Sequence, residues 1–244
     1  MKKVLIALAA VTAAGLPLAA SAQLTANVSL TSNYKFRGQD QDASRTRAVK
    51  PALQGGFDYT FGDTGFYVGN WNSSVDWLPG NSLESDFYGG YKMTAGDFAL
   101  DFGALAYIYS GYQPAKTIEL YASAGWGPLV AKYSHTVSDG YFAFSDASGN
   151  RLDGTNTGYF NVAYAQEIFP SVTLKAALGY TRLSSDIRHD GTTPWKNYTD
   201  YSVGAAYDFG GGVSLSGSVV GATKKETYNP VNRTRLVVAL TKTM

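Results

Sequence analysis

The chain alternates apolar and polar residues, a pattern first seen at residues 24–36. Every second residue shares a side of such a segment, and we call each of the two sets a parity. The even-numbered parity is apolar apart from Ser32, with Leu24, Ala26, Val28, Leu30, Tyr34 and Phe36. The odd-numbered parity is polar, with Thr25, Asn27, Ser29, Thr31, Asn33 and Lys35. A period of two residues is typical of a β-strand, whereas a helix has a period of about 3.6 residues. The polar run RGQDQD at residues 37–42 predicts that this strand ends there and continues as a surface loop.

Twelve segments follow strand-like patterns, each about as long as a tilted strand that crosses a bilayer. They cover residues 24–36, 51–61, 66–76, 83–94, 98–109, 117–126, 129–138, 158–169, 172–183, 197–209, 213–223 and 234–242. These segments predict an all-β chain in which each strand forms a hairpin with the next.

The connections between these segments alternate between long and short. The long connections are residues 37–50, 77–82, 110–116, 139–157, 184–196 and 224–233, and the short ones are 62–65, 95–97, 127–128, 170–171 and 210–212. Outer-membrane barrels combine an even number of strands with long outer loops and short periplasmic turns. We therefore predict a transmembrane antiparallel up-and-down β-barrel of about 12 strands. A soluble series of hairpins is the alternative, but it has no reason to separate long from short connections.

Residues 1–22 have the layout of a secretory signal peptide. Lys2 and Lys3 precede an apolar stretch, and Ala20-Ser21-Ala22 forms a cleavage site. A membrane anchor is disfavoured because the apolar run is shorter than the roughly 20 residues that a spanning helix needs. We expect cleavage after Ala22, export through the periplasm, and a single barrel domain at residues 23–244 in the bacterial outer membrane.

Composition excludes several classes of protein. The 20 basic and 19 acidic residues nearly balance, so no nucleic-acid partner is expected. A chain without cysteine cannot be a disulfide scaffold, and two separated histidines do not make a metal cluster. We therefore expect neither a metal nor a cofactor. The 18 Tyr, 12 Phe, 4 Trp and 27 Gly suit strands, turns and membrane interfaces.

Charged residues within the strands fall on the polar parity, which predicts that they face the barrel interior, or lumen. A lysine or arginine on the lipid face near the midplane costs about 2–4 kcal/mol. The candidate lumen or constriction residues are Lys35, Arg37, Glu84, Asp86, Asp101, Lys132 and Asp200. Four of these residues predict a charged belt near the outer mouth, with Lys35 and Arg37 facing Glu84 and Asp86. Such a belt would either brace the wall or filter ions.

Aromatic residues mark the predicted strand ends, where a membrane interface favours them. Those expected at the two interfaces are Tyr34, Phe36, Trp77 and Tyr198 at the outer end and Phe61, Trp126, Phe169 and Phe209 before short turns. Phe169 fits poorly because Glu167 shares its parity and must avoid lipid. An irregularity in the strand is therefore expected there.

Four stretches resemble the TorF family of porins, which are Gcw_chp-type conserved exported bacterial proteins. They are SLTSNYKFRG (29–38), PALQGGFDY (51–59), TGFYVGNWNSSVD (64–76) and ESDFYGGYK (84–92). The resemblance is specific over about the first third of the chain. It implies an outer-membrane barrel of Gram-negative bacteria that is inserted by the outer-membrane assembly machinery. The final residue, Met244, stands where such barrels often end in an aromatic residue.

Three functions are compatible with such a barrel. The first is a porin or narrow channel for small hydrophilic solutes or ions, selected by charged lumen residues. The second is a barrel whose plugged lumen serves a structural or surface-binding role, with the loop at residues 139–157 folded inward. The third, a barrel hydrolase, is disfavoured because His135 is followed two places later by Val137 rather than serine, and His189 lies in a loop. We therefore expect no catalytic residues and no enzymatic activity.

Overall fold

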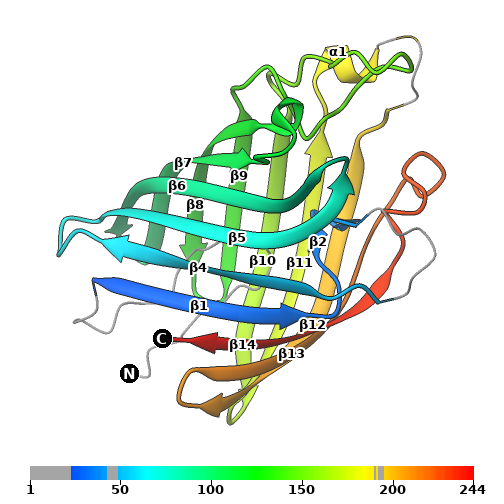
Figure 1. The fold of residues 1–244 in the computed structure, drawn as a ribbon. Helices are drawn as coiled ribbons and strands as arrows, with labels where there is room; N and C mark the ends of the chain where they lie inside the picture. The colour runs from blue at the N-terminus through cyan, green and yellow to red at the C-terminus, as the bar shows by residue number, and fades with distance from the viewer. Residues whose placement is uncertain (1–22, 43–48, 190, 192–194) are drawn as a thin grey trace.

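The computed structural model describes residues 23–42, 49–189, 191 and 195–244. The expected signal peptide lies outside the described residues and stays a prediction. Among the described residues, no helix combines the length and the apolar character needed to cross a membrane. Strands make up most of the described chain, and its helical structure is confined to η1 (Gln113–Ala115) and α1 (Ser185–Arg188) (Figure 1).

Twelve antiparallel strands close into one barrel, so the predicted fold is confirmed. Strands that follow one another in the sequence pair with one another. The barrel closes where β1 (Leu24–Thr31) pairs with both β4 (Ala52–Thr60) and β14 (Arg235–Thr243). The other barrel strands are β5 (Phe66–Leu78), β6 (Asn81–Ala95), β7 (Phe98–Ile108), β8 (Thr117–Trp126), β9 (Leu129–Thr136), β10 (Gly158–Phe169), β11 (Val172–Arg182), β12 (Tyr198–Gly210) and β13 (Val213–Ala222).

The outer face of the barrel is apolar all the way round. Each barrel strand contributes at least two large hydrophobic side chains that are exposed, such as Leu53 and Phe57 on β4 or Leu236 and Leu240 on β14. Soluble monomers rarely expose contiguous apolar patches above a few hundred Å². A belt of this kind requires contact with lipid, and it arises because the apolar parity of every strand points outward.

Short turns gather at one end of the barrel, which we call the turn end, and the longer connections gather at the other, the loop end. One connection differs from the prediction. Residues 77–82 do not form a long loop, because β5 and β6 continue and join through Pro79 and Gly80 alone. The register of this hairpin shifts between Ser74 and Leu78, and Leu78 turns into a buried apolar cluster. Burial of that side chain is the physical reason for the longer hairpin.

The irregularity expected near Phe169 is confirmed. The register of β10 against β11 shifts between Glu167 and Phe169. The Glu167 carboxylate accepts a hydrogen bond of 3.0 Å from the backbone N–H of Ser171 in the following turn. The shift therefore lets Glu167 bond to the turn while Phe169 remains exposed.

Burial of the inward-facing side chains differs between the two ends. Toward the loop end, inward residues such as Glu84, Glu119 and Asp200 are buried. Toward the turn end, inward residues such as Asp58 and Lys175 are only half-buried. Strands β12 and β13 present small inward residues, which are Ser202, Gly204, Ala206, Ser214, Ser216 and Ser218. The interior is therefore filled at the loop end and accessible to solvent toward the turn end.

Candidate functional site

The segment after β1 folds into the barrel. Strand β1 ends at Thr31, and β2 (Lys35–Phe36) and β3 (Gln39–Asp40) form a separate two-stranded hairpin. We call residues 32–42 the plug. The first barrel strand therefore does not continue to Phe36 as predicted, and the predicted surface loop at residues 37–42 is wrong. The alternation of apolar and polar residues in β1 continues into the plug, but the apolar side chains of the plug pack inside the barrel and do not face lipid.

The plug reverses direction at Arg37 and Gly38, whose φ angles are 46° and 75°. A Cβ atom added to Gly38 would lie 2.6 Å from the carbonyl oxygen of Gly221 and 2.7 Å from the Cβ of Asp200. Both the positive φ and the close approach to β12 and β13 favour glycine here. Gly38 thus lets the plug lie directly against the barrel wall.

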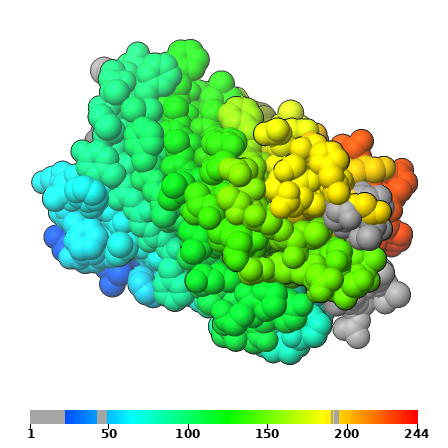
Figure 2. All heavy atoms as spheres, turned by 90° about the horizontal axis from the view of Figure 1, so that it is seen from above, coloured from blue at the N-terminus to red at the C-terminus, as the bar shows by residue number. Residues whose placement is uncertain are grey.

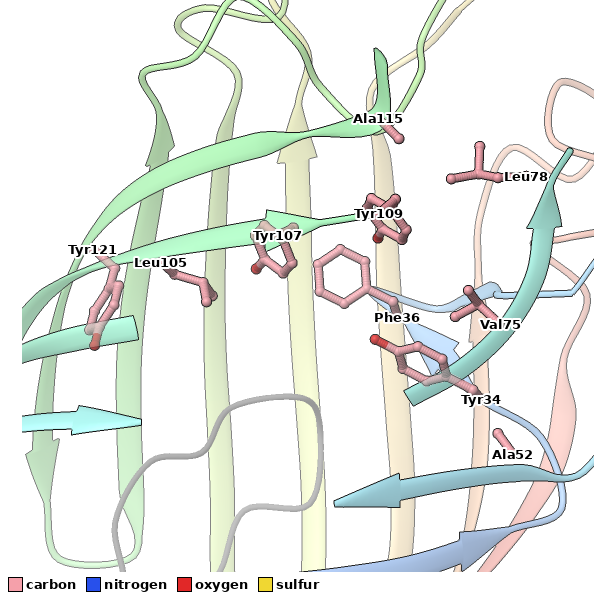
Figure 3. Close-up of a cluster of buried hydrophobic side chains, with 10 residues drawn as sticks. All are labelled: Tyr34, Phe36, Ala52, Val75, Leu78, Leu105, Tyr107, Tyr109, Ala115 and Tyr121. Atoms are coloured by element: carbon pink, nitrogen blue, oxygen red, sulfur yellow. The ribbon is translucent and has the colours of Figure 1, made fainter. Parts of the chain in front are cut away.

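Apolar side chains of the plug pack in an aromatic cluster inside the barrel (Figure 3). The Phe36 ring lies 5.5 Å from the Tyr107 ring and 5.2 Å from the Phe142 ring, measured between centroids. The Tyr34 ring meets Trp71 edge-on at 5.5 Å. Tyr34 and Phe36 are both buried, so their expected place at the membrane interface is wrong.

The other aromatics expected at the outer interface also face inward. Trp77 is half-buried and lies 5.4 Å from Tyr109, edge-on, against the same cluster. Tyr198 is buried beside Tyr228 in a second cluster. At the turn end, by contrast, Phe61, Trp126 and Phe209 are all exposed, as interfacial residues should be. Their contact with a membrane interface stays a prediction.

Arg37 makes the central ionic contact of the plug. Its Nη2 atom lies 2.7 Å from Oε2 of Glu119 on β8, and both side chains are at least 95% buried. Its Nη1 atom donates a 3.1 Å hydrogen bond to the hydroxyl of Tyr141 in the loop after β9. The guanidinium carbon also lies 4.2 Å from the centroid of the Tyr159 ring. The plug is therefore joined to two barrel strands and one loop through a single side chain.

Lys35 ties the plug to the loop between β13 and β14. Its ammonium donates hydrogen bonds to the carbonyl oxygens of Gly38, Val231 and Arg233 at 2.9, 3.0 and 2.6 Å. It also lies 3.4 Å from Asp40, which accepts hydrogen bonds of 3.0 and 2.8 Å from Arg235. Burial lowers the pKa of Lys35 to about 8, although the negative charge of Asp40 opposes this shift.

All four residues of the predicted belt are buried inside the barrel, but the expected opposition of Lys35 and Arg37 to Glu84 and Asp86 is wrong, because Lys35 lies beside Asp40 and Arg37 beside Glu119. Glu84 accepts hydrogen bonds of 2.8 Å from the hydroxyls of both Tyr34 and Tyr109. Asp86 is 3% exposed, and its Oδ1 atom has no hydrogen-bond partner within the described residues. Across the part of the chain that the structure covers, neither carboxylate forms an ion pair. Arg37 meets Glu119 instead.

The remaining candidate residues, Asp101, Lys132 and Asp200, form no ion pair among the described residues. The Tyr67 hydroxyl donates a 2.7 Å hydrogen bond to Asp101, and the Tyr159 hydroxyl donates one of 3.1 Å to Asp200. The Lys132 ammonium lies 3.9 Å from the centroid of the Tyr121 ring. All three candidates point inward, as parity predicted. Whether they select solutes stays a prediction.

Glu119, Tyr141 and Phe142 are among the site residues that the sequence analysis did not identify. Glu119 has inward parity, but nothing local distinguishes it from the other inward acids. Tyr141 and Phe142 lie in the loop at residues 137–157, which folds inward and packs on Leu183 and Ile187. Figure 2 shows this loop (light green) beside the loop after β11 (yellow). Among the described residues, no group of acidic residues and histidines has the geometry to hold a metal ion.

Comparison with solved structures supports a porin-like fold. The KdgM porin in complex with disordered oligogalacturonate is 10% identical, with a TM-score of 0.54 over 90% of this chain and 97% of that one. The NanC porin is 12% identical, with a TM-score of 0.56 over 89% and 97%. A structure from work on the in-meso crystallization of membrane proteins is 11% identical, with a TM-score of 0.57 over 91% and 83%. At these identities the likeness concerns the fold.

Comparison by sequence identifies the family. No curated protein matches the chain. A family profile described as bacterial protein of unknown function (Gcw_chp) matches residues 17–244. The resemblance to porin-like barrels is therefore confirmed for the fold, whereas the TorF name stays a prediction. The chain belongs to the Gcw_chp family of bacterial proteins.

Proposed function

We propose that this protein is a channel of the bacterial outer membrane for small hydrophilic solutes or ions, and that the plug closes its loop end in the conformation described here. The observation that carries the proposal is the contrast between the two faces of the wall. The outer face is apolar on every strand, and the inner face is hydrophilic and half-buried toward the turn end. A structural barrel would not need a solvated interior.

The size of the barrel limits the solute. Twelve strands enclose a narrower interior than the 16 to 18 strands of large aqueous porins. Lys92, Lys132, Lys175, Asp58 and Asp101 project into the half-buried region or border it. These charges would act on a passing solute at short range. The likeness of the fold to the KdgM and NanC porins supports a channel function.

A permanently plugged barrel is the second candidate, and one observation favours it. The Arg37–Glu119 pair is almost fully buried, and breaking such a pair by removing one partner typically costs about 3–5 kcal/mol. If the plug never leaves, the protein serves as a structural or surface-binding element. The loop at residues 137–157, which adds Phe142 to the cluster around Phe36, reinforces this closure.

Swelling of proteoliposomes separates these candidates. We define the plug-replacement variant as the chain with residues 33–41 exchanged for a glycine-serine linker of equal length. Wild type and this variant are reconstituted, and their folding is checked by the gel shift on heating. We expect uptake of small sugars by both, and faster uptake by the variant. Folded protein of both kinds that admits no solute would reject the channel and leave the structural role.

A further inference from the structure

The pocket that holds Arg37 is built mainly by the barrel and not by the plug. Glu119 comes from β8 and Tyr159 from β10, while Tyr141 comes from the loop after β9. Phe36 is the plug's own contribution, with its ring centroid 4.8 Å from the guanidinium carbon. If the plug moved away, the carboxylate and the aromatic face of the wall would remain together with the phenol of the loop.

These groups have the chemistry that recognises an organic cation. A carboxylate binds a guanidinium or ammonium group through charge-assisted hydrogen bonds. An aromatic face within about 6 Å adds an electrostatic attraction to the same cation. Here the Glu119 carboxylate also accepts a 3.3 Å hydrogen bond from the hydroxyl of Tyr107, which fixes its position. The pocket is therefore organised before any cation enters.

The wall around this pocket carries further buried carboxyl groups that form no ion pair among the described residues. Glu84, Asp86 and Glu119 are all buried, and Arg37 pairs with one of them. The Oδ1 atom of Asp86 has no hydrogen-bond partner among the described residues, although Asp86 is 3% exposed. The other cation of the plug, Lys35, is bound to Asp40 and to backbone carbonyls. A cation that enters beside these carboxyl groups favours their charged form, and the resulting attraction favours binding of the cation.

We propose that this pocket is a binding site for solutes that carry a guanidinium or primary ammonium group, and that Arg37 occupies it as an internal substitute for such a solute. The inference rests on the proposed channel function, since the solute reaches the pocket through the mouth. Binding of the solute and docking of the plug exclude each other. By linkage, a cationic solute then favours the open mouth, and opening favours binding of the solute.

Replacement of Arg37 by alanine tests the pocket directly, because it vacates the site. The probe is ethylguanidinium, and the matched control ligand is ethylurea, which has a similar shape without charge. Binding to the purified barrel in detergent is measured by calorimetric titration and by the shift in melting temperature. We expect Arg37→Ala to bind ethylguanidinium at least tenfold more tightly than ethylurea. We also expect wild type to bind ethylguanidinium at least tenfold more weakly than Arg37→Ala does.

Two further variants locate the binding. Arg37→Ala combined with Glu119→Gln should lose the preference for ethylguanidinium over ethylurea. Arg151→Ala removes an arginine from a 2.5 Å pair with Asp139 whose side chains are both exposed, so it should gain no binding. Equal affinity of Arg37→Ala for the two probes, or unchanged binding after Glu119→Gln, would overturn the proposal.

Folding provides a second measurement if Arg37→Ala assembles poorly. Its folded yield is then compared in ethylguanidinium and in ethylurea at equal concentration. A higher yield in ethylguanidinium supports the pocket, and equal yields reject it. Neither measurement depends on conduction. A conducting barrel that does not bind ethylguanidinium rejects this inference alone, whereas binding in a folded barrel that never conducts supports the pocket and rejects the channel.

Discussion

The guanidinium of Arg37 lies 2.7 Å from the carboxylate of Glu119, which is 82 residues further along the chain, and both groups are buried inside the barrel. This pair joins the plug to the wall at a point where neither charge can be solvated by bulk water. Its loss would leave one buried charge without a partner, which is a costly state. The position of the plug therefore depends on this contact.

The first prediction concerns the energy of that pair. Arg37→Met and Glu119→Gln should each lower the free energy of unfolding by about 3 kcal/mol, because each leaves the other group buried and unpaired. The double variant should lose clearly less than the sum of the two. Urea unfolding in lipid vesicles measures all three values. In the exposed Arg151–Asp139 pair, the same cycle should give a coupling below about 1 kcal/mol. Additive effects at Arg37 and Glu119 would contradict this prediction.

The second prediction concerns the two tyrosines that donate to Glu84. Tyr34→Phe and Tyr109→Phe each remove one hydroxyl while keeping the ring in the cluster. Each should cost about 1–3 kcal/mol, because a buried acceptor loses a donor. The change is read from the urea midpoint in vesicles. Tyr201→Phe is the control, because its hydroxyl bonds to Thr234 in an exposed pair. An equal loss in all three variants would show that burial does not matter here.

The third prediction concerns the two faces of the wall, and neighbouring residues of β12 test it. Val203 is 52% exposed on the outer face, whereas Ser202 faces inward and is half-buried. Val203→Lys should reduce stability by about 2–4 kcal/mol, since a lysine would face lipid near the midplane. Ser202→Lys should be tolerated, because its ammonium can reach the solvated interior. The folded fraction in vesicles, read from the gel shift on heating, decides between them. A higher folded fraction for Val203→Lys than for Ser202→Lys would mean that Ser202 faces lipid and Val203 faces the interior.

The fourth prediction concerns the fit of Gly38 against the wall. Gly38→Ala places a methyl group 2.6 Å from a backbone oxygen of β13. The plug should therefore leave its docked position, while the twelve barrel strands remain folded. Gly96→Ala also has a positive φ, of 61°, but meets open space, so it controls for backbone strain alone.

Because the chain has no cysteine, Gln39→Cys reports on plug release through labelling with a bulky maleimide. Labelling should rise severalfold when Gly38→Ala is added and remain unchanged when Gly96→Ala is added. Equal protection of Cys at position 39 in all three backgrounds would show that the plug tolerates the larger side chain.

The barrel wall was predictable because each of its strands separates lipid from a polar interior. This requirement imposes strict alternation, so the predicted bounds of β8 and β10 agree with the observed ones. The irregularity near Glu167 was predictable for the same reason, because a charged side chain on the parity that faces lipid requires a local shift of the strand. Short local patterns carry this information because each wall residue faces either lipid or lumen.

The plug was not predictable from such patterns. Residues 33–36 continue the alternation of β1, but their apolar side chains meet rings of β5 and β7 instead of lipid. The alternation pattern predicts that the side chain of Arg37 faces inward, and it predicts the same for several acidic side chains. It cannot say that Arg37 reaches Glu119 rather than Glu84, because that depends on the depth of the hairpin in three dimensions. Pairing across the lumen has no local signature.

Single-channel current in a planar bilayer tests most directly whether this barrel conducts past a plug that can be displaced. Wild type and the plug-replacement variant are inserted under the same salt and voltage. We predict discrete conductance steps with long closures for wild type, and steps of at least equal size with few closures for the variant, because the linker cannot bond to Glu119. Folded protein of both kinds that inserts without any conductance step would contradict the account.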